Sequence, residues 1–205
     1  MYLSGMTRDV RRYSPGPEAL KALSHGDRLK MLGILRLHGP QTATGLAEQL
    51  GLNSGAASYH LRQLAKHGFI EEAPELGNAR ERWWRSAHET TWTEDTAAPG
   101  TPEAESMGGY LATVIERQVE MLFASLPAHA GLPAEWRRAS NASDGTFWLT
   151  AEQAYELSER LTAELVRMQA ETPPVTEPGP EGTRRFTVQI HAFPHPGLPG
   201  AKETP

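Results

Sequence analysis

The stretch LAEQLGLNSGAASYHLRQLAKHGFI, residues 46–70, decides how the first half of this chain folds. Two short amphipathic segments flank Gly51–Asn53, where the glycine allows a tight turn. Thr42 can cap the first segment as a helix, and Asn53 can cap the second. We expect that helix to run to His67, with apolar side chains at helical spacing on its inner face: Ala57, Leu61 and Leu64. Two helices joined by a turn of this length make a helix-turn-helix.

The sequence on both sides of this motif predicts the rest of a small domain. Helices are expected on its N-terminal side, over 17–23 and 26–38. On its C-terminal side the periodicity changes, and residues 69–87 predict a β-hairpin. We expect Trp83 to anchor the second strand of this hairpin in the core and Trp84 to lie on the opposite side, because successive side chains of a strand alternate.

The outer face of the second helix carries small polar groups with a tyrosine and an arginine, and we interpret it as a surface that reads double-stranded DNA. A helix fits a major groove about 12 Å wide when such groups point outward and an apolar face holds the helix from behind. The hairpin would then be a wing along the DNA backbone or the minor groove. The residues expected to bind DNA are Thr42, Thr44, Asn53, Ser54, Gly55, Ser58, Tyr59, His60 and Arg62, with Asn78, Arg80 and Arg82 on the hairpin. For His60, packing at the edge of the helix is the alternative.

The sequence LSHGDRLKMLGILRLHGPQTATGLAEQLGLNSGAASYHLRQLAKHGFIEE, residues 23–72, resembles the winged helix of the ArsR family of bacterial regulators. The similarity runs from Glu18 to Ala87, and the Ser-Tyr-His-Leu-Arg-Gln-Leu core at 58–64 is its most specific part. The resemblance implies a homodimer on an inverted-repeat operator, usually a repressor that a signal releases. The second half resembles a larger-bodied subgroup of actinobacterial regulators.

The family's founding members sense metals through cysteine thiolates or through Asp/His sites on the last helix, and this chain departs from them. It has no cysteine, which excludes thiolate sites and disulfides. Its eight histidines give no set of three ligands by local spacing, as a zinc site needs. We therefore expect no metal and no cofactor.

Charge is divided unevenly along the chain. Residues 1–88 hold 12 Lys+Arg and 8 Asp+Glu, a net of +4, whereas residues 89–205 hold 8 and 17, a net of −9; together they give −5. A basic first half favours a polyanionic partner. We find no signal peptide and no apolar run that could span a membrane, so we expect a cytoplasmic, nucleoid-associated protein without a membrane partner.

The predicted fold is mainly α with a small amount of β, and the chain divides into four parts. We expect a winged helix-turn-helix DNA-binding domain over 15–88, a Pro/Gly-rich linker over 89–103, a dimerisation and effector-sensing region of helices and strands over 104–193, and a flexible tail over 194–205.

Two helices and two strands are expected in the second half. One helix face repeats at steps of three and four: Leu111, Ile115, Val119, Leu122 and Leu126. Thr150 and Gln153 form a capping box at the start of the other helix. The segments 145–149 and 184–193 have the composition or alternation of strands.

The second half is expected to join two copies of the chain. The helix over 105–126 could be a dimer helix or a core helix. Because a reader of a palindrome needs a twofold partner, we favour dimerisation through this helix together with the helix at 17–23. Six aromatic residues leave two interpretations open, an apolar pocket for a small effector or the core of this half: Trp136, Phe147, Trp148, Tyr155, Phe186 and Phe193. An effector would act by changing the spacing of the two reading helices.

No catalytic motif is visible in the sequence, so we expect no enzyme. Two alternatives to a sequence-specific regulator remain open. One is a winged helix that acts as a protein-interaction module, and the other is a non-specific architectural DNA binder.

Overall fold

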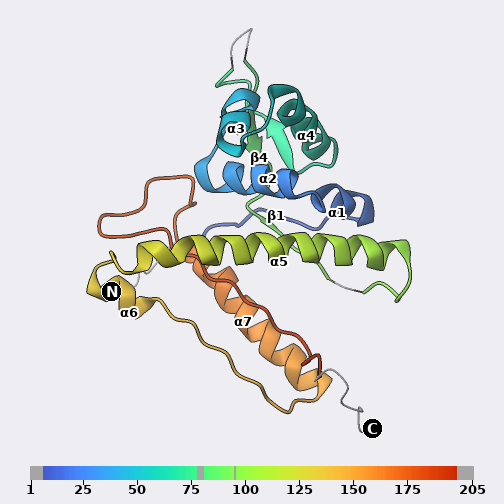
Figure 1. Ribbon diagram of the computed structural model, residues 1–205, viewed down its shortest axis with the longest axis vertical. Coiled ribbons are helices and arrows are strands. Elements are labelled where there is room, and N and C mark those ends of the chain that lie inside the picture. The colour runs from blue at the N-terminus through green and yellow to red at the C-terminus, as the bar shows by residue number, and fades with distance from the viewer. Residues whose placement is uncertain (1–6, 78–80, 95, 198–205) are drawn as a thin grey trace.

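The computed structural model describes residues 7–77, 81–94 and 96–197. Within these ranges a helical domain with short strands lies on one side of a long helix, and a second, looser part lies on the other (Figure 1). The first part contains β1 (Arg12–Tyr13), α1 (Pro17–Leu23), α2 (Gly26–His38), β2 (Gln41–Thr42), α3 (Ala43–Leu50), α4 (Ser54–Lys66), β3 (Ile70–Glu72), β4 (Trp83–Ser86) and β5 (Thr90–Thr91).

The helix-turn-helix forms as the sequence predicts, because its turn and caps are set by local chemistry. Gly51 ends α3 in the left-handed conformation, with φ of 66°. The Asn53 side chain accepts a hydrogen bond from the N–H of Ala56 at 2.8 Å and so caps α4. Thr42 caps α3 in the same way, since its hydroxyl accepts from the N–H of Gly45 at 3.1 Å. These contacts confirm the predicted helix starts.

A single apolar core holds α1 to α4 together. Its largest fully buried side chains are Leu23, Met31, Leu32, Leu35, Leu46, Leu61, Leu64 and Phe69. They come from all four helices and from the residue before β3, so the first half has its own core.

The sheet beside these helices has three strands in the order β2-β4-β3, with both pairs antiparallel. The predicted hairpin is therefore present, and β2 extends it. The prediction for the two tryptophans is wrong: Trp84 is buried, at 6 % exposed, and Trp83 is only half-buried. Because strand side chains alternate, a choice of face that is off by one residue reverses every assignment on the strand.

A second, parallel pair joins β1 to β5, with Arg12 opposite Thr90, and sequence analysis did not predict it. Tyr13 secures this pair to the domain: its hydroxyl donates to the carbonyl of His67 at 2.9 Å, and its ring packs edge-on against Phe69. Strands this short carry no pattern that could be read from sequence alone.

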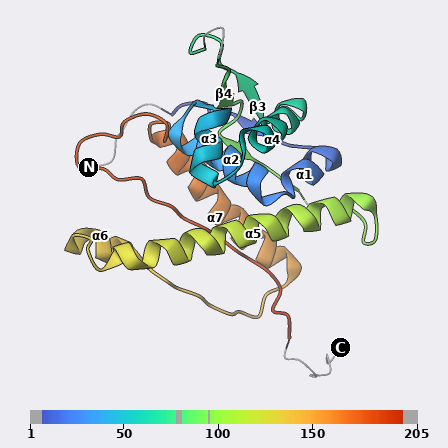
Figure 2. The ribbon, with the colours of Figure 1, turned by 45° about the horizontal axis from the view of Figure 1, so that its top comes forward.

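The second part consists of α5 (Pro102–His129), α6 (Ala134–Ala139), α7 (Ala151–Glu171) and long extended segments. Figure 2 shows α5 running across the molecule, with α1 to α4 on one side and α7 crossing it obliquely. The capping box is confirmed, since Thr150 accepts from the N–H of Gln153 at 3.2 Å and Gln153 accepts from the N–H of Thr150 at 2.9 Å. None of the described helices is long and apolar enough to cross a membrane.

The two strands predicted in the second half are wrong. Residues 145–149 and 184–193 are wholly described, and neither pairs with another strand. Their apolar side chains are exposed, Val188 at 52 % and Phe147 at 68 %. An alternating pattern makes a segment able to form a strand, but a strand also needs a neighbour that completes its hydrogen bonds.

Candidate nucleic-acid interface

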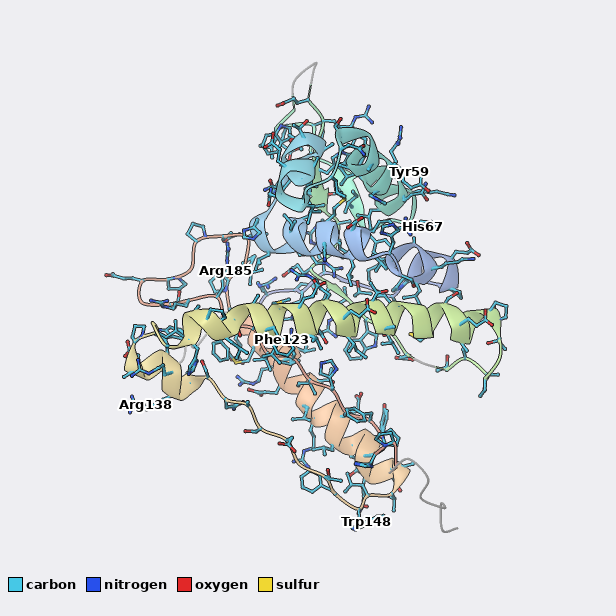
Figure 3. The ribbon with its side chains drawn as sticks, viewed as in Figure 1. Tyr59, His67, Phe123, Arg138, Trp148 and Arg185 are labelled. Carbon is cyan, nitrogen blue, oxygen red and sulfur yellow. The ribbon has the colours of Figure 1, made fainter. Side chains whose placement is uncertain are left out.

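Helix α4 has two chemically distinct faces. Ala57, Leu61 and Leu64 are fully buried against the core. The opposite face presents Ser54, Gly55, Tyr59 and Arg62 to solvent, with Ser58 half-buried beside them. Figure 3 places Tyr59 on the outer side of the domain, far from α5, and the ring is 50 % exposed. The helix is held from behind by apolar packing and offers hydroxyl, phenol and guanidinium groups in front.

Two of the predicted DNA contacts near the starts of α3 and α4 also cap these helices. Asn53 is exposed, but its side chain is already engaged as the helix cap. Thr44 is exposed at the start of α3, whereas Thr42 is half-buried and is also a cap. Asn53 and Thr44 are therefore exposed at the first turns of two helices that pack against each other.

His60 does not belong to this surface, which corrects its assignment as a DNA contact. The residue is only 7 % exposed and lies under α4, where its ring centroid is 4.6 Å from that of His25. Packing at the helix edge, the alternative for this residue, is what the structure shows. Helical periodicity places position 60 beside the buried position 61, and the sequence does not show how far the apolar face extends.

The hairpin carries arginines that are already paired with glutamates. Arg82 is exposed, and its guanidinium lies 3.1 Å from the carboxylate of Glu72. Arg85 pairs with Glu71 at 2.7 Å and with Glu75 at 2.5 Å, and the hydrogen bond to Glu71 is the main cause that raises the pKa of Arg85. A phosphate would have to displace a carboxylate to bind either arginine.

Two of the predicted wing residues, Asn78 and Arg80, lie outside the described residues. On α4 itself, Arg62 and Lys66 are exposed cations, and neither forms an ion pair with a described residue. The unpaired positive charge of this surface therefore lies on the helix rather than on the described part of the hairpin.

Comparison with known proteins agrees with this geometry. A model of a family described as a helix-turn-helix domain matches residues 23–73. The first half of the chain is a winged helix-turn-helix domain. Helix-turn-helix domains bind DNA by placing their second helix, here α4, in the major groove.

Two solved structures are similar to the chain. One is the NMR structure of the homodimeric winged helix-turn-helix DNA-binding domain (fragment 1–100) of Mb0332 from Mycobacterium bovis, a possible ArsR-family transcriptional regulator, at 20% identity and a TM-score of 0.32, covering 55% of this chain and 81% of that one. The other is a mutant MarR from E. coli, at 17% identity and a TM-score of 0.30, covering 67% and 75%. At these TM-scores neither structure supports an inference about this chain. No curated protein matches the sequence.

The six aromatic residues proposed as an effector pocket do not form one within a single chain. Trp136 and Phe186 lie near each other, with ring centroids 6.4 Å apart, and Arg184 lies over the Trp136 ring. The other four are at least two-thirds exposed: Phe147, Trp148, Tyr155 and Phe193. Figure 3 shows Trp148 at the far end of the second part, near the start of α7.

A hollow of about 350 Å³ does lie between α5, α7 and the extended segment 188–192, but it contains none of the six aromatic residues. Its lining mixes polar side chains such as Gln118 and Thr162 with apolar ones such as Leu165 and Val188. Within a single copy of the chain these six positions form neither the predicted pocket nor a core, since four of them are at least two-thirds exposed.

One cluster of polar side chains was missed by sequence reasoning. His25, Asp27 and His60 each place one potential metal-ligating atom within 4.8 Å of the other two. Because His25 and His60 lie 35 positions apart in sequence, their spacing gave no signal. Only the packing of α4 against the start of α2 brings them together.

Proposed function

We propose that this protein is a sequence-specific, double-stranded-DNA-binding transcriptional regulator of the ArsR type. The observation that carries the proposal is the exposed polar face of α4, which lies directly opposite a fully buried apolar face and beside a β-hairpin. In this arrangement Ser54, Ser58 and Tyr59 would contact base edges, while Arg62 would contact a guanine or a phosphate. Arg82 of the hairpin would contact the backbone.

A homodimer is part of the proposal, and α5 supports it. On one side of this helix Met107 and Tyr110 are buried against α1 and α2. On an adjacent face runs a stripe of exposed apolar residues, which we call the outer stripe: Leu111, Ile115, Val119, Leu122 and Leu126. Contiguous apolar surface of this kind marks an interaction site. A second copy covering it would place two α4 helices on one inverted-repeat operator, where the protein would act as a repressor.

Control by a small-molecule signal is the last part of the proposal, and it rests on how the second part is attached to the first. The N–H of Arg8 donates to the carbonyl of Ala170 at 3.0 Å, and its guanidinium donates to the carbonyl of Thr172 at 2.9 Å. The same guanidinium lies 2.6 Å from Glu89, next to β5. A ligand that moves α7 would therefore shift the DNA-binding domain through Arg8. The spacing between the α4 helices of the two copies would then change.

The first experiment selects a binding site from a random duplex library with the purified full-length chain and then measures affinity by fluorescence anisotropy. We expect a palindromic site, with affinity at least about 1,000-fold above that for random DNA. Tyr59→Ala and Ser58→Ala should relax the preference at particular base pairs. Arg82→Ala should weaken binding to all sequences similarly and reduce the salt dependence. Arg138→Ala removes the same charge from α6, far from α4 (Figure 3), and should leave affinity unchanged.

Two outcomes would overturn the proposal in different ways. Equal affinity for the selected site and for random DNA would identify an architectural binder. Binding that is undetectable, or insensitive to salt, would point to a protein-interaction module, because phosphate contacts make affinity fall steeply as salt rises.

A further inference from the structure

The buried imidazole of His60 has no hydrogen-bond partner in the described part of the chain. Its side chain is 9 % exposed, its Nδ1 atom is buried without a partner, and its Nε2 atom lies 3.9 Å from a carboxylate oxygen of Asp27, which is too far for a hydrogen bond. The buried Nδ1 atom needs a separate partner such as a water, whereas Nε2 is the atom that faces Asp27 and is available to bind an ion.

Two further ligand groups face this ring from the start of α2. Asp27 is in the first turn of the helix, and a nitrogen of His25 lies 4.0 Å from the same carboxylate oxygen. The His25 nitrogen receives only a long hydrogen bond, 3.3 Å, from the N–H of Asp27. Neither residue is deeply buried, so the cluster is open to solvent on the side of α2.

From this geometry we propose that His25, Asp27 and His60 bind a divalent transition-metal ion of the zinc class. Two imidazoles and one carboxylate, with a water in the fourth position, are a set that zinc accepts. Zinc bonds of about 2.0–2.1 Å at tetrahedral angles place ligand atoms about 3.3–3.4 Å apart. The two separations to Asp27, 3.9 and 4.0 Å, need a contraction of about half an ångström. The ligand nitrogens of His25 and His60 lie within 4.8 Å of each other and need a contraction of up to about 1.5 Å, which side-chain rotation can supply.

The charge state of the cluster suits a metal. Burial lowers the pKa of His60, and His25 and Arg28 lower it further against the opposing effect of Asp27. These effects favour the neutral ring, which is the form that binds metal. A bound ion would link α4, one residue after Tyr59, to the start of α2.

The test measures metal binding by the purified full-length chain in the absence of DNA and of any purification tag. Zn²⁺ is titrated by calorimetry, and Co²⁺ is titrated by its visible absorption, which reports coordination geometry. We expect one ion per chain and a rise in the melting temperature with Zn²⁺. His25→Asn retains a side-chain oxygen that can cap α2 while removing the imidazole, and Asp27→Asn retains the shape while removing the charge. Each should weaken binding about tenfold or more.

Matched controls separate this site from other histidines. His38→Asn makes the same substitution at the other end of α2, and the double variant His191→Asn with His195→Asn removes the histidines of the C-terminal segment. Both controls should bind Zn²⁺ like the wild type. The proposal is overturned if the wild type binds no more tightly than His25→Asn and Asp27→Asn, or if the controls lose binding as much as they do. Because no DNA is present, either result leaves the proposed regulator function independently testable in a metal-free buffer.

Discussion

The two parts of this molecule differ in how their apolar residues are used. Every described residue that is buried lies between Val10 and Tyr110, and none from 111 to 197 is buried. Yet α5 and α7 are long helices with regular apolar positions, and most of the exposed large apolar side chains belong to this second part. The winged helix buries its apolar side chains within a single copy. The second part has the regular apolar positions of packed helices, but a single copy leaves them exposed.

Helix α5 belongs to both regions and shows what separates them. Its first turns supply Met107 and Tyr110 to the core of the winged helix, while its outer stripe faces solvent. The same helix therefore has one apolar face that is buried and an adjacent apolar face that is exposed. We infer that the second part completes its packing by association, and the following predictions test that difference.

The largest effect is expected from the same substitution made in each region. Leu61→Ala removes a fully buried side chain of α4 and should lower the free energy of unfolding by about 2–5 kcal/mol. Leu149→Ala truncates a side chain that is 45 % exposed and should change it by less than about 0.5 kcal/mol. Urea denaturation measures both. Equal losses would mean that residue 149 is buried in solution and that the comparison is wrong.

The next effect concerns the outer stripe. Leu122→Glu places a charge at the centre of the proposed interface and should raise the dissociation constant of the dimer at least about 100-fold, because an unpaired carboxylate resists burial. Sedimentation equilibrium measures the constant. Ala124→Glu adds the same charge on the same helix outside the stripe and serves as the control. A wild type that is monomeric at micromolar concentration would disprove the proposed dimer.

A smaller effect is expected at Arg36, whose hydrogen bonds connect α2 to residues 88–91 after the hairpin. Its guanidinium donates to the carbonyl of His88 at 3.0 Å and to the hydroxyl of Thr91 at 2.9 Å, and burial lowers its pKa to about 10. Arg36→Met removes both hydrogen bonds, although the His88 carbonyl still accepts from the hydroxyl of Ser86 at 2.6 Å, and should cost about 1–3 kcal/mol of unfolding free energy. Arg12→Met changes an exposed arginine and should cost far less. Similar losses would show that the Arg36 hydrogen bonds contribute little.

The smallest effect depends on pH and tests the packing of His88 beside the paired strands β1 and β5. Burial lowers the pKa of His88, with Arg36 and Arg11 adding to the effect and Glu71 opposing it. The neutral ring is thus favoured in the folded state, so stability should fall as the pH drops below about 6.5, where the unfolded chain takes up the proton first. His88→Phe keeps the stacking on Tyr13, whose centroid is 4.9 Å away, and should lose less stability between pH 7.5 and 5.5. Identical urea midpoints for the two proteins at both pH values would contradict this assignment.

What could be predicted from sequence was local. The caps at Thr42, Asn53 and Thr150 and the apolar face of α4 depend on residues a few positions apart, and they were confirmed. The face predicted for Trp84 was wrong, because the face that is buried depends on the side of the sheet on which the core lies. The strand predicted over 184–193 was wrong, because an alternating pattern does not show whether a neighbouring strand is present to pair with it.

The candidate site divides in the same way. By itself the sequence determined that a helix begins after Asn53 and that small polar groups face away from Leu61 and Leu64, since spacing along a helix sets both. Only the tertiary structure decided that His60 is buried on the inner side of that helix beside Asp27, and that no described residue from 111 to 197 is buried. Helix periodicity is a property of neighbouring residues, whereas burial and the meeting of distant side chains depend on how separate elements pack.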